Sequence, residues 1–239
     1  MDNAVYVALG RQAGLRDEMR LVANNVANMS TAGYRREATL FSEVIARLPV
    51  EGGSVSMSRA RVRVTDFAPG IAEATGGALD LAIDGSGFFR VETPAGERLT
   101  RAGAFLQRAD GSVATAEGHV LLDAGGAPVV LPPGASEIAV GADGSVSVDG
   151  RPAARLGLVA PADGAVLIRE TGQLFEATGP VEPVETHLRQ GFLEGSNVSP
   201  VTELARMIAV QRAYEAGQRA LEQEDQRVRT AVRTLAGTA

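Results

Sequence analysis

The two ends of the chain carry the sequence pattern that most limits its fold. Each end has a stripe of mainly apolar residues that recur at alternating spacings of three and four. This spacing is typical of coiled-coil helices, each of which buries a narrow stripe against another helix, and the second stripe continues for about five heptads. The stripe near the N-terminus comprises Val5, Ala8, Gln12, Leu15, Met19, Val22, Val26 and Met29. The stripe near the C-terminus comprises Leu204, Met207, Gln211, Tyr214, Gln218, Leu221, Asp225, Val228, Val232 and Leu235.

The stripes favour contact between helices over two ordinary helices that pack on a globular core. A core-packing helix usually has a wide apolar face, whereas these stripes are narrow. Polar residues on a seam weaken it but fix its register or its partner, and the second stripe holds Gln211, Gln218 and Asp225. The ends of the chain are nearly neutral whereas its middle is acidic, which suits ends that meet protein and a middle that meets water. Asn197 or Ser199 is expected to cap the second helix.

Asparagines crowd the end of the first predicted helix, at Asn24, Asn25 and Asn28. Asparagine is a mediocre helix former because its amide competes for backbone hydrogen bonds. We expect these amides to bond to neighbouring subunits and so to select one stagger between copies; the alternative is that they only end the helix, which fits Asn28 best. Gly33 is expected to end the helix in a left-handed conformation, and Tyr34 to anchor the chain beyond it.

The middle of the chain predicts an antiparallel β domain. It contains five Asp-Gly pairs, which between alternating apolar residues are the strongest short-range signal for a β-hairpin turn. The pairs lie at 84–85, 110–111, 143–144, 149–150 and 163–164. Ahead of this domain, residues 49–75 contain a short alternating run between Gly-Gly and Pro-Gly pairs. This segment predicts an extended hairpin or arm, with a plain linker as the alternative.

Composition excludes several kinds of chemistry. All 23 basic residues are Arg and there is no Cys, so a phosphate-binding loop with its Lys, a Lys Schiff base, a thiol nucleophile and Cys-bound zinc are all excluded. The net charge of −6 argues against a nucleic-acid partner. The two histidines have no Glu-x-x-His spacing, and Gly85-Ser86-Gly87 lacks the further glycine of a nucleophile elbow. We expect no enzyme, no cofactor, no metal, no membrane-spanning segment and no cleaved signal peptide.

Motifs spread over nearly the whole chain resemble the signatures of bacterial flagellar rod and hook proteins. The first is Asn24-Asn25-Val26-Ala27-Asn28 followed by Thr31-Ala32-Gly33-Tyr34-Arg35-Arg36, although the family usually has Lys at the position of Arg35. The second is Leu79-Asp80-Leu81-Ala82-Ile83-Asp84-Gly85-Ser86-Gly87-Phe88-Phe89, similar to the entry strand of the family's β domain. The third is Leu193-Glu194-Gly195-Ser196-Asn197-Val198 followed by Glu203-Leu204 and Gln211-Arg212-Ala213-Tyr214-Glu215. The opening residues and the length look most like the proximal-rod type, with the distal-rod and hook types as alternatives.

The resemblance implies a structural building block of the flagellar basal body. Such proteins are exported through the flagellum's own type III apparatus without signal cleavage, and they polymerise helically with themselves and with homologous rod proteins. The resulting tube crosses the periplasm and transmits torque, with the terminal helices inside and the β domain outside. The residues expected at the assembly interface are Val5, Leu15, Met19, Val22, Asn24, Asn25, Asn28, Gly33, Tyr34, Asn197, Leu204, Met207, Gln211, Tyr214, Leu221, Val228 and Val232.

The expected fold is therefore α+β, an antiparallel all-β central domain flanked by terminal helices that pair as a coiled-coil-like layer. The expected divisions are 1–36 and 198–239 for the helical domain, 37–75 for the arm or linker and 76–197 for the β domain. Both ends are expected to be labile outside an assembly, so that proteolysis leaves a fragment of about 40–195. A periplasmic cell-wall-binding protein and a soluble coiled-coil adaptor that forms closed dimers are the alternatives from other classes.

Overall fold

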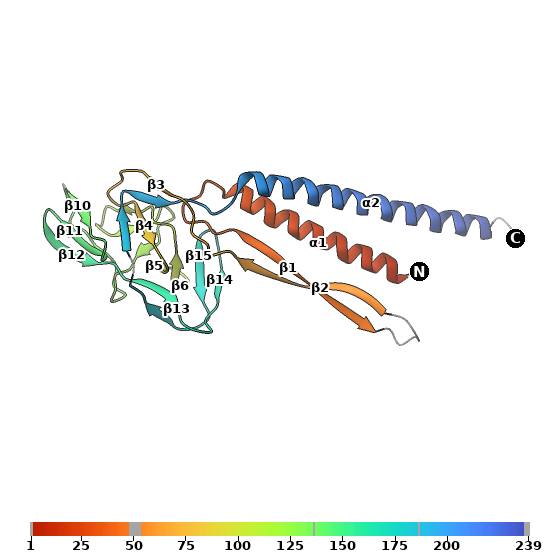
Figure 1. Ribbon diagram of the computed structural model, residues 1–239, viewed down its shortest axis with the longest axis horizontal. Coiled ribbons are helices and arrows are strands. Elements are labelled where there is room, and N and C mark those ends of the chain that lie inside the picture. The colour runs from red at the N-terminus through yellow and green to blue at the C-terminus, as the bar shows by residue number, and fades with distance from the viewer. Residues whose placement is uncertain (1, 48–53, 136, 186, 237–239) are drawn as a thin grey trace. The chain divides into compact units, whose positions relative to one another are not determined.

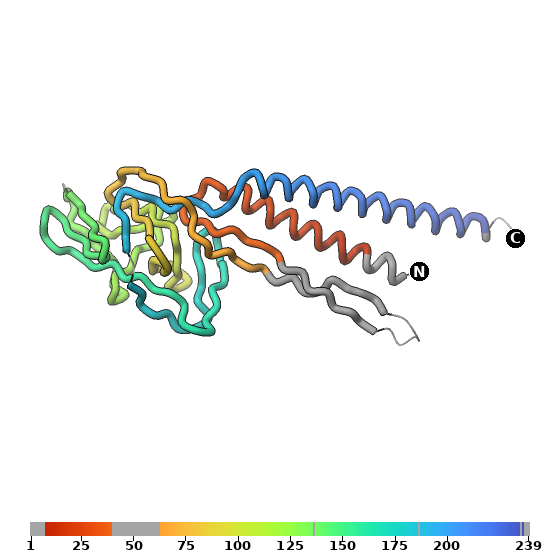
Figure 2. The backbone as a smooth tube through the Cα atoms, in the orientation of Figure 1, coloured from red at the N-terminus to blue at the C-terminus, as the bar shows by residue number. Residues whose placement is uncertain are grey.

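A computed structural model describes the backbone of residues 2–47, 54–135, 137–185 and 187–236. The side chains of residues 2–7, 40–47, 54–62 and 235 lie outside the description (Figure 2). The chain divides into two compact units. We call the first the helical unit; it comprises Met1–Ala27, Glu37–Asp66 and Ser199–Ala239. The second, the β unit, comprises Asn28–Arg36 and Phe67–Val198.

The helical unit contains two long helices and one β-hairpin. Helix α1 (Asp2–Ala27) packs against helix α2 (Pro200–Ala236) and against both strands of the hairpin, β1 (Glu37–Arg47) and β2 (Ser54–Thr65) (Figure 1). The two strands are antiparallel, with Glu37 opposite Thr65 and one register shift at Ser42/Glu43. Within the segment 49–75, for which hairpin, arm and linker were all open, residues 54–65 form a hairpin with β1, and this hairpin belongs to the same compact unit as the helices. Residues 48–53 lie outside the described residues.

Helix α1 ends through a short series of turns. The Thr31 N–H donates to the Asn28 carbonyl and the Tyr34 N–H donates to the Thr31 carbonyl. Gly33 then has φ of +71°, which confirms the left-handed conformation expected there. A side chain at Gly33 would also collide with the backbone, because a Cβ would lie 2.4 Å from the Ala102 nitrogen. Glycine is therefore required at this position both by its φ and by the close approach of the backbone that follows β6.

The β unit consists of short strands that pair only in antiparallel fashion among the pairings the structure describes. The largest sheet has the order β14-β15-β6-β5-β9-β8-β7, with β13 and β16 joined to it through β5. Smaller sheets pair β10-β11-β12, β17-β4 and β18-β3. The strands are β3 (Ala72–Ala74), β4 (Leu81–Asp84), β5 (Phe88–Thr93), β6 (Gly96–Thr100), β7 (Leu106–Gln107), β8 (Val113–Ala114), β9 (Val120–Leu121), β10 (Ile138–Val140), β11 (Ser145–Val148), β12 (Arg151–Arg155), β13 (Leu158–Pro161), β14 (Leu167–Arg169), β15 (Leu174–Ala177), β16 (Val181–Pro183), β17 (His187–Gln190) and β18 (Phe192–Glu194).

The core of the β unit follows from the alternation of its strands. One buried cluster surrounds Phe89 and Phe105, whose rings meet edge to face with centroids 5.2 Å apart. A second, smaller cluster contains Phe88 and Phe175, with centroids 5.9 Å apart. Phe88 and Phe89 are neighbours on β5, so the two sides of this strand supply one core each. The fold is α+β, with terminal helices and a largely antiparallel central region, as the sequence predicts.

Three of the five Asp-Gly pairs lie in hairpin turns. Those at 110–111, 143–144 and 149–150 connect the antiparallel pairs β7-β8, β10-β11 and β11-β12. In the last of them both residues have positive φ, Asp149 at +49° and Gly150 at +75°. The prediction was wrong for the other two pairs, because β4 pairs with β17 rather than β5, and β13 pairs with β5 and β16 rather than β14. An Asp-Gly turn reverses the chain, but it does not determine which strand lies alongside.

Candidate assembly interface

The two terminal helices lie side by side and run antiparallel within the helical unit. The Gln12 amide donates to the Tyr214 carbonyl at 3.0 Å, and the Arg206 guanidinium pairs with Glu18 at 2.8 Å. As residue numbers rise along α1 from 12 to 18, those of their partners on α2 fall from 214 to 206. The N-terminal and C-terminal helices of one chain therefore contact each other within the single subunit.

Helix α1 buries more than the predicted stripe. Val22 is fully buried and Gln12 is nearly so, while Leu15 and Met19 are half-buried, in line with their places on the stripe. Leu21 and Asn25, which lie off the stripe, are also buried. The reason is that α1 packs against the β1–β2 hairpin as well as against α2, so it presents a wide face rather than a two-helix seam. The side chain of Val5 lies outside the described residues.

Helix α2 uses only three residues of its predicted stripe inside the subunit. Its less exposed side runs through alternate spacings of four and three and carries Glu203, Met207, Val210, Tyr214, Gly217 and Leu221. This line shares Met207, Tyr214 and Leu221 with the predicted stripe. Six other predicted positions are exposed, namely Leu204, Gln211, Gln218, Asp225, Val228 and Val232. The side chain of Leu235 lies outside the described residues. The structure thus leaves a second stripe of α2 without cover from its own chain.

The exposed side of α2 is apolar where the helix begins and again near its end. Val201 is 79% exposed, and Leu204 and Ile208 are each 49% exposed. Val228 and Val232 are 43% and 59% exposed. Residues at spacings of three and four lie on one side of a helix, so Val201, Leu204 and Ile208 form one continuous apolar strip, which we call the outer strip. Several adjacent exposed apolar residues on one helix indicate a surface that meets protein.

Asn25 acts inside the subunit. Its side chain is fully buried, and its amide donates to the Glu37 carbonyl at 2.8 Å and to the Glu203 carboxylate at 3.3 Å. Its Oδ1 accepts the Glu37 N–H at 3.1 Å. One asparagine therefore joins the end of α1 to the start of β1 and to the first turn of α2. The inter-subunit role proposed for the asparagines stays a prediction for Asn24, which is exposed, and for Asn28, which is half-buried and accepts a hydrogen bond from Thr31.

The two terminal motifs meet in the β unit around one buried carboxylate. Glu194 is the acceptor for Arg35 at 2.6 Å and for Arg101 at 3.4 Å, and the side chains of all three residues are at least 93% buried. The backbone N–H of Gly70 donates to the same carboxylate at 3.0 Å. Burial lowers the pKa of the Arg101 guanidinium from its ordinary value, and the neighbouring Glu194 charge opposes that shift. Two buried cations thus depend on one carboxylate among the described residues.

Tyr34 and Asn197 lie beside this cluster. The Tyr34 ring is 1% exposed, and the Arg169 guanidinium lies 4.6 Å from its centroid, a cation–π contact. The Asn197 Oδ1 accepts the Arg36 N–H at 2.6 Å, and its amide donates to the Ala68 carbonyl at 2.9 Å. Asn197 was one of two predicted caps of α2, but its side chain is used here instead. The helix begins at Pro200, directly after Ser199, whose hydroxyl bonds to that of Thr202.

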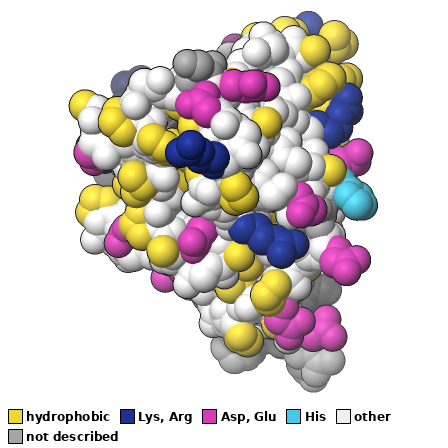
Figure 3. Space-filling view, turned by 90° about the vertical axis from the view of Figure 1, so that its left-hand side faces the viewer, with side chains coloured by type: hydrophobic (Ala, Val, Ile, Leu, Met, Phe, Trp, Pro, Cys, Tyr) yellow, Lys and Arg dark blue, Asp and Glu magenta, His cyan; other side chains and the backbone are white. Residues whose placement is uncertain are grey.

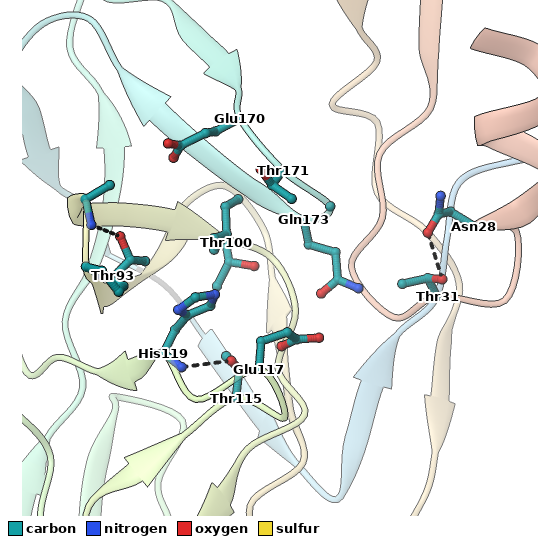
Figure 4. A pocket seen from close by; sticks show the side chains of 14 residues that line it. Asn28, Thr31, Thr93, Thr100, Thr115, Glu117, His119, Glu170, Thr171 and Gln173 are labelled. Atoms are coloured by element: carbon teal, nitrogen blue, oxygen red, sulfur yellow. Dashed lines mark hydrogen bonds between the residues drawn. The ribbon is translucent and has the colours of Figure 1, made fainter. Parts of the chain in front are cut away.

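A hollow of about 500 Å³ opens in the β unit (Figure 4). Most of its lining residues are polar, among them Thr93, Thr100, Thr115 and His119, but the surface that they present to the hollow is mainly apolar. Each of these three threonine hydroxyls bonds to a backbone group of its own turn or strand end, so they stabilise turns. Among the described residues, no three His, Asp or Glu side chains are placed to hold a metal ion, and no helix has the length and apolar content to cross a membrane.

The end face of the β unit has a mixed surface (Figure 3). Acidic side chains are dispersed over it among small groups of apolar ones, and basic side chains lie between them. Such a surface is typical of one that faces water. It contrasts with the continuous outer strip on α2.

Comparison with known proteins decides the family. Models of three flagellar families match the chain: "Flagella basal body rod protein" at residues 5–35, "Flagellar hook protein FlgE/F/G D1 domain" at 82–148 and "Flagellar basal body rod FlgEFG protein C-terminal" at 189–234. The FlgF protein of Caulobacter vibrioides is 37% identical over 241 residues, which cover 98% of each chain. The chain belongs to the FlgF family of flagellar basal-body rod proteins.

Other relatives agree with this placement. The FlgF protein of Rhizobium meliloti is 34% identical over the full length of both chains. The FlgG basal-body rod protein of Bacillus subtilis is 28% identical over 95% of this chain and 96% of its own. The distal-rod alternative is therefore not favoured. As a member of the FlgF family the chain is a structural protein and not an enzyme, as its sequence predicts.

Sequence reasoning missed the acidic residues that organise these contacts. Glu203 is 1% exposed and Glu194 is 3% exposed, yet neither was a predicted interface residue. Glu203 lies in the first turn of α2, where the helix dipole favours a carboxylate, and that position is a usable sequence signal. For Glu194 the signal was only its place in the motif before α2, since nothing in local sequence says that two distant arginines will reach it.

Proposed function

We propose that this chain is a subunit of the proximal flagellar rod and that it assembles through its terminal helices with copies of itself and with homologous rod proteins. The tube so formed crosses the periplasm and carries torque. The subunit reaches its place through the flagellar type III export apparatus, without a cleaved signal. Family membership supports the rod, and the geometry of α2 supports the mode of assembly.

The observation that carries the proposal is that α2 has two contact sides and only one is covered. One side pairs with α1, while the outer strip of Val201, Leu204 and Ile208 is exposed. In a helical polymer each subunit meets its neighbours through non-identical surfaces, so a second apolar side on the same helix is what assembly requires. The pairing of both helices into a coiled-coil-like layer is part of the proposal.

The unequal lengths of the helices supply a second argument. α1 has 26 residues and α2 has 37, and the Gln12–Tyr214 bond fixes where they lie side by side. At about 1.5 Å per residue, roughly the last dozen residues of α2 extend beyond the start of α1 (Figure 1). Their described side chains, including Val228 and Val232, are exposed. A neighbouring subunit would cover this overhang.

A pair of matched double variants tests the proposal in cells that lack their own copy of the gene. Leu204→Ser with Ile208→Ser removes two of the three residues of the outer strip, whereas Val166→Ser with Ile168→Ser removes two apolar residues of similar exposure, one just before β14 and one within it. We expect the first variant to abolish swimming in soft agar and to leave basal bodies that stop at the proximal rod in electron micrographs. The second should swim normally. Normal swimming by the first variant would contradict assembly through α2.

The alternative functions predict different results in three further experiments. Basal bodies from a deletion strain that stop only at the distal rod or at the hook would favour those types. Closed dimers of the purified chain, measured by light scattering, would favour a coiled-coil adaptor. Retention on purified cell-wall sacculi would favour a cell-wall-binding protein.

A further inference from the structure

The chain passes between its two units four times. The passages lie at residues 27/28, 36/37, 66/67 and 198/199. On the side of the β unit, only three segments carry them: 28–36, the stretch that begins at Phe67 and the stretch that ends at Val198 (Figure 2). Separate single segments between two folded units would twist easily, because the φ and ψ bonds of each residue rotate readily unless contacts hold them. The contacts among these three segments therefore set how stiffly load can pass along the chain.

The Glu194 carboxylate touches all three segments at once. Glu194 itself belongs to the last segment, its Oε1 accepts Arg35 from the first, and the same oxygen accepts the Gly70 N–H from the second. The Arg101 guanidinium holds the other oxygen and also donates to the Gly85 carbonyl at 2.9 Å, so it anchors the carboxylate to the body of the β unit. The backbone adds one more bond, from the Gly33 N–H to the Glu194 carbonyl at 2.7 Å.

Asn197 joins the same three segments a second time. Its Oδ1 accepts the Arg36 N–H from the first segment, and its amide donates to the Ala68 carbonyl of the second. Two side chains three residues apart thus make parallel cross-links between the same strands. Two cross-links at separate points resist twisting, whereas a single one acts as a pivot.

We propose that Glu194 and Asn197 form a torsional joint within the β unit: they pin the three segments that lead out of this unit into one rigid element, so that load entering the β unit is shared among all three. This role is distinct from the outer strip, which joins one subunit to another. The joint itself is a property of the single chain. Its load-bearing role rests on the proposed rod function.

The cluster is built so that loss of its carboxylate has a large effect. Two guanidinium groups share one buried carboxylate, and Arg35 Nε and Nη1 and Arg101 Nε have no hydrogen-bond partner within the described part of the chain. Removing the one negative charge leaves both cations buried without compensation, which is far more costly than losing an exposed ion pair. Arg35 binds through a single nitrogen, so a lysine can replace that one contact.

Amide hydrogen exchange of the purified full-length chain tests the joint. Glu194→Gln keeps the shape of the side chain and removes its charge. We expect the Gly70 amide, which donates to the carboxylate, to exchange about 10- to 100-fold faster, the range set by loss of a hydrogen bond to a charged group. The Gly33 amide donates to the Glu194 backbone carbonyl and should also exchange faster, because the segment that carries this carbonyl is held less firmly. The Val146 amide in the distant β10–β12 sheet should keep its rate. Unchanged rates at Gly33 and Gly70 would overturn the proposal.

Three further variants make the test specific. Glu97→Gln removes the carboxylate of an exposed pair with Arg90 in the same unit and should leave every one of these rates unchanged. Arg35→Lys should preserve the rates at Gly33 and Gly70, which a purely packing role for the long arginine would not. Asn197→Ala should accelerate exchange at Arg36 while Gly70 keeps its protection. If Glu97→Gln accelerated exchange at Gly70 as much as Glu194→Gln does, protection of Gly70 would not depend specifically on the Glu194 carboxylate, which would contradict the proposal.

Rotation under load tests the mechanical part. In cells whose only copy carries Glu194→Gln, we expect assembled basal bodies whose locked motors twist further under a given torque, measured with a bead on the hook. If that variant is not incorporated, Asn197→Ala serves for the same measurement. Wild-type stiffness together with accelerated exchange would overturn the load-bearing role and leave assembly through α2 untouched. Conversely, if the outer-strip variant fails to assemble but keeps normal exchange at Gly70, assembly through α2 is affected while the joint is intact, so the two proposals are independent.

Discussion

The β unit and the helical unit differ in how much each one buries within a single chain. The β unit has two apolar clusters, and residues such as Phe89 and Phe175 are completely inaccessible. In the helical unit, only Leu21, Val22 and Val210 are buried apolar residues among the side chains described. Apolar burial is the main source of folding free energy, so the described side chains predict that the β unit is the more stable of the two on its own. Under the proposed assembly, neighbouring subunits would supply further burial to the helical unit.

The polar contacts of the two units show the same contrast. In the helical unit, buried polar groups do much of the joining: Asn25 links three elements and Gln12 links the two helices. In the β unit, the buried polar cluster at Glu194 lies at the passages to the other unit, apart from the phenylalanine cores. Hydrogen bonds specify geometry but contribute little net stability, so these polar contacts fix how the elements of the helical unit lie but add little to its free energy of unfolding.

Limited proteolysis of the isolated chain should give the largest difference between the units. Helices with few buried apolar contacts open locally at low free-energy cost, so we expect cleavage within α1 and α2 to be on the order of 100-fold faster than within the β unit. Because the β1–β2 hairpin belongs to the helical unit, the resistant fragment should lie within about 67–198 rather than begin near residue 40. Mass spectrometry of timed digests measures this. Equal resistance along the chain would break the comparison.

Asn25→Leu should give the next largest effect and should affect the helical unit alone. The change leaves the Glu37 N–H and carbonyl and the Glu203 carboxylate without this buried partner, at about 1–3 kcal/mol for each unsatisfied group. We expect a loss of about 2–4 kcal/mol from the helical unit, seen as an earlier loss of helical circular dichroism in urea. The exposed Asn24→Leu is the matched control and should change stability by less than about 0.5 kcal/mol. A shift of the β unit's own transition would show that the two units fold together.

The sequence predicts the types of element better than their partners. Heptad spacing found both helices, and Asp-Gly pairs found three hairpins, because these signals are local. The pairing of β4 with β17, separated by about a hundred residues, has no local signal. The wide buried face of α1 was also missed, since a two-helix seam explains its stripe and only the hairpin explains Leu21 and Asn25.

The candidate interface could be predicted only in part for the same reason. The outer strip lies next to the predicted stripe, and Leu204 belongs to both. Glu194 and Arg101 are 93 residues apart, so their ion pair depends on the complete fold. Gly33 was predicted correctly because its requirement for positive φ is a property of one residue.

Gly217→Ala should have a smaller effect that tests how closely the helices approach. A Cβ at this position would lie 2.0 Å from the Gln12 amide nitrogen, so Gln12 must move and lose its bond to Tyr214. Alanine gains about 1 kcal/mol in helix propensity, which partly offsets a packing cost of about 1–3 kcal/mol. We expect a net loss of about 1 kcal/mol in urea denaturation. In a Gln12→Ala background, Gly217→Ala should leave the free energy of unfolding unchanged or raise it. If it lowers the free energy of unfolding there too, contact with Gln12 is not the reason for glycine at position 217.

The smallest effect should come from acid, at a hairpin turn of the β unit. The Ser145 hydroxyl and then the Ser145 N–H, both donating to Asp143, hold the pKa of this exposed carboxyl below its usual value. Because the folded pKa is depressed, the stabilisation is fully present above the unfolded pKa of about 4 and is lost as pH falls through the lower folded value. We expect exchange at the Ser145 amide, corrected for its intrinsic pH dependence, to accelerate slightly below about pH 4, and Asp143→Asn to remove that pH dependence. Amide exchange at Gln12 and Tyr214 should show no such acceleration, because their contact is a neutral hydrogen bond. An equal acceleration at these two residues would show that the Asp143 turn is not the cause of the acid response.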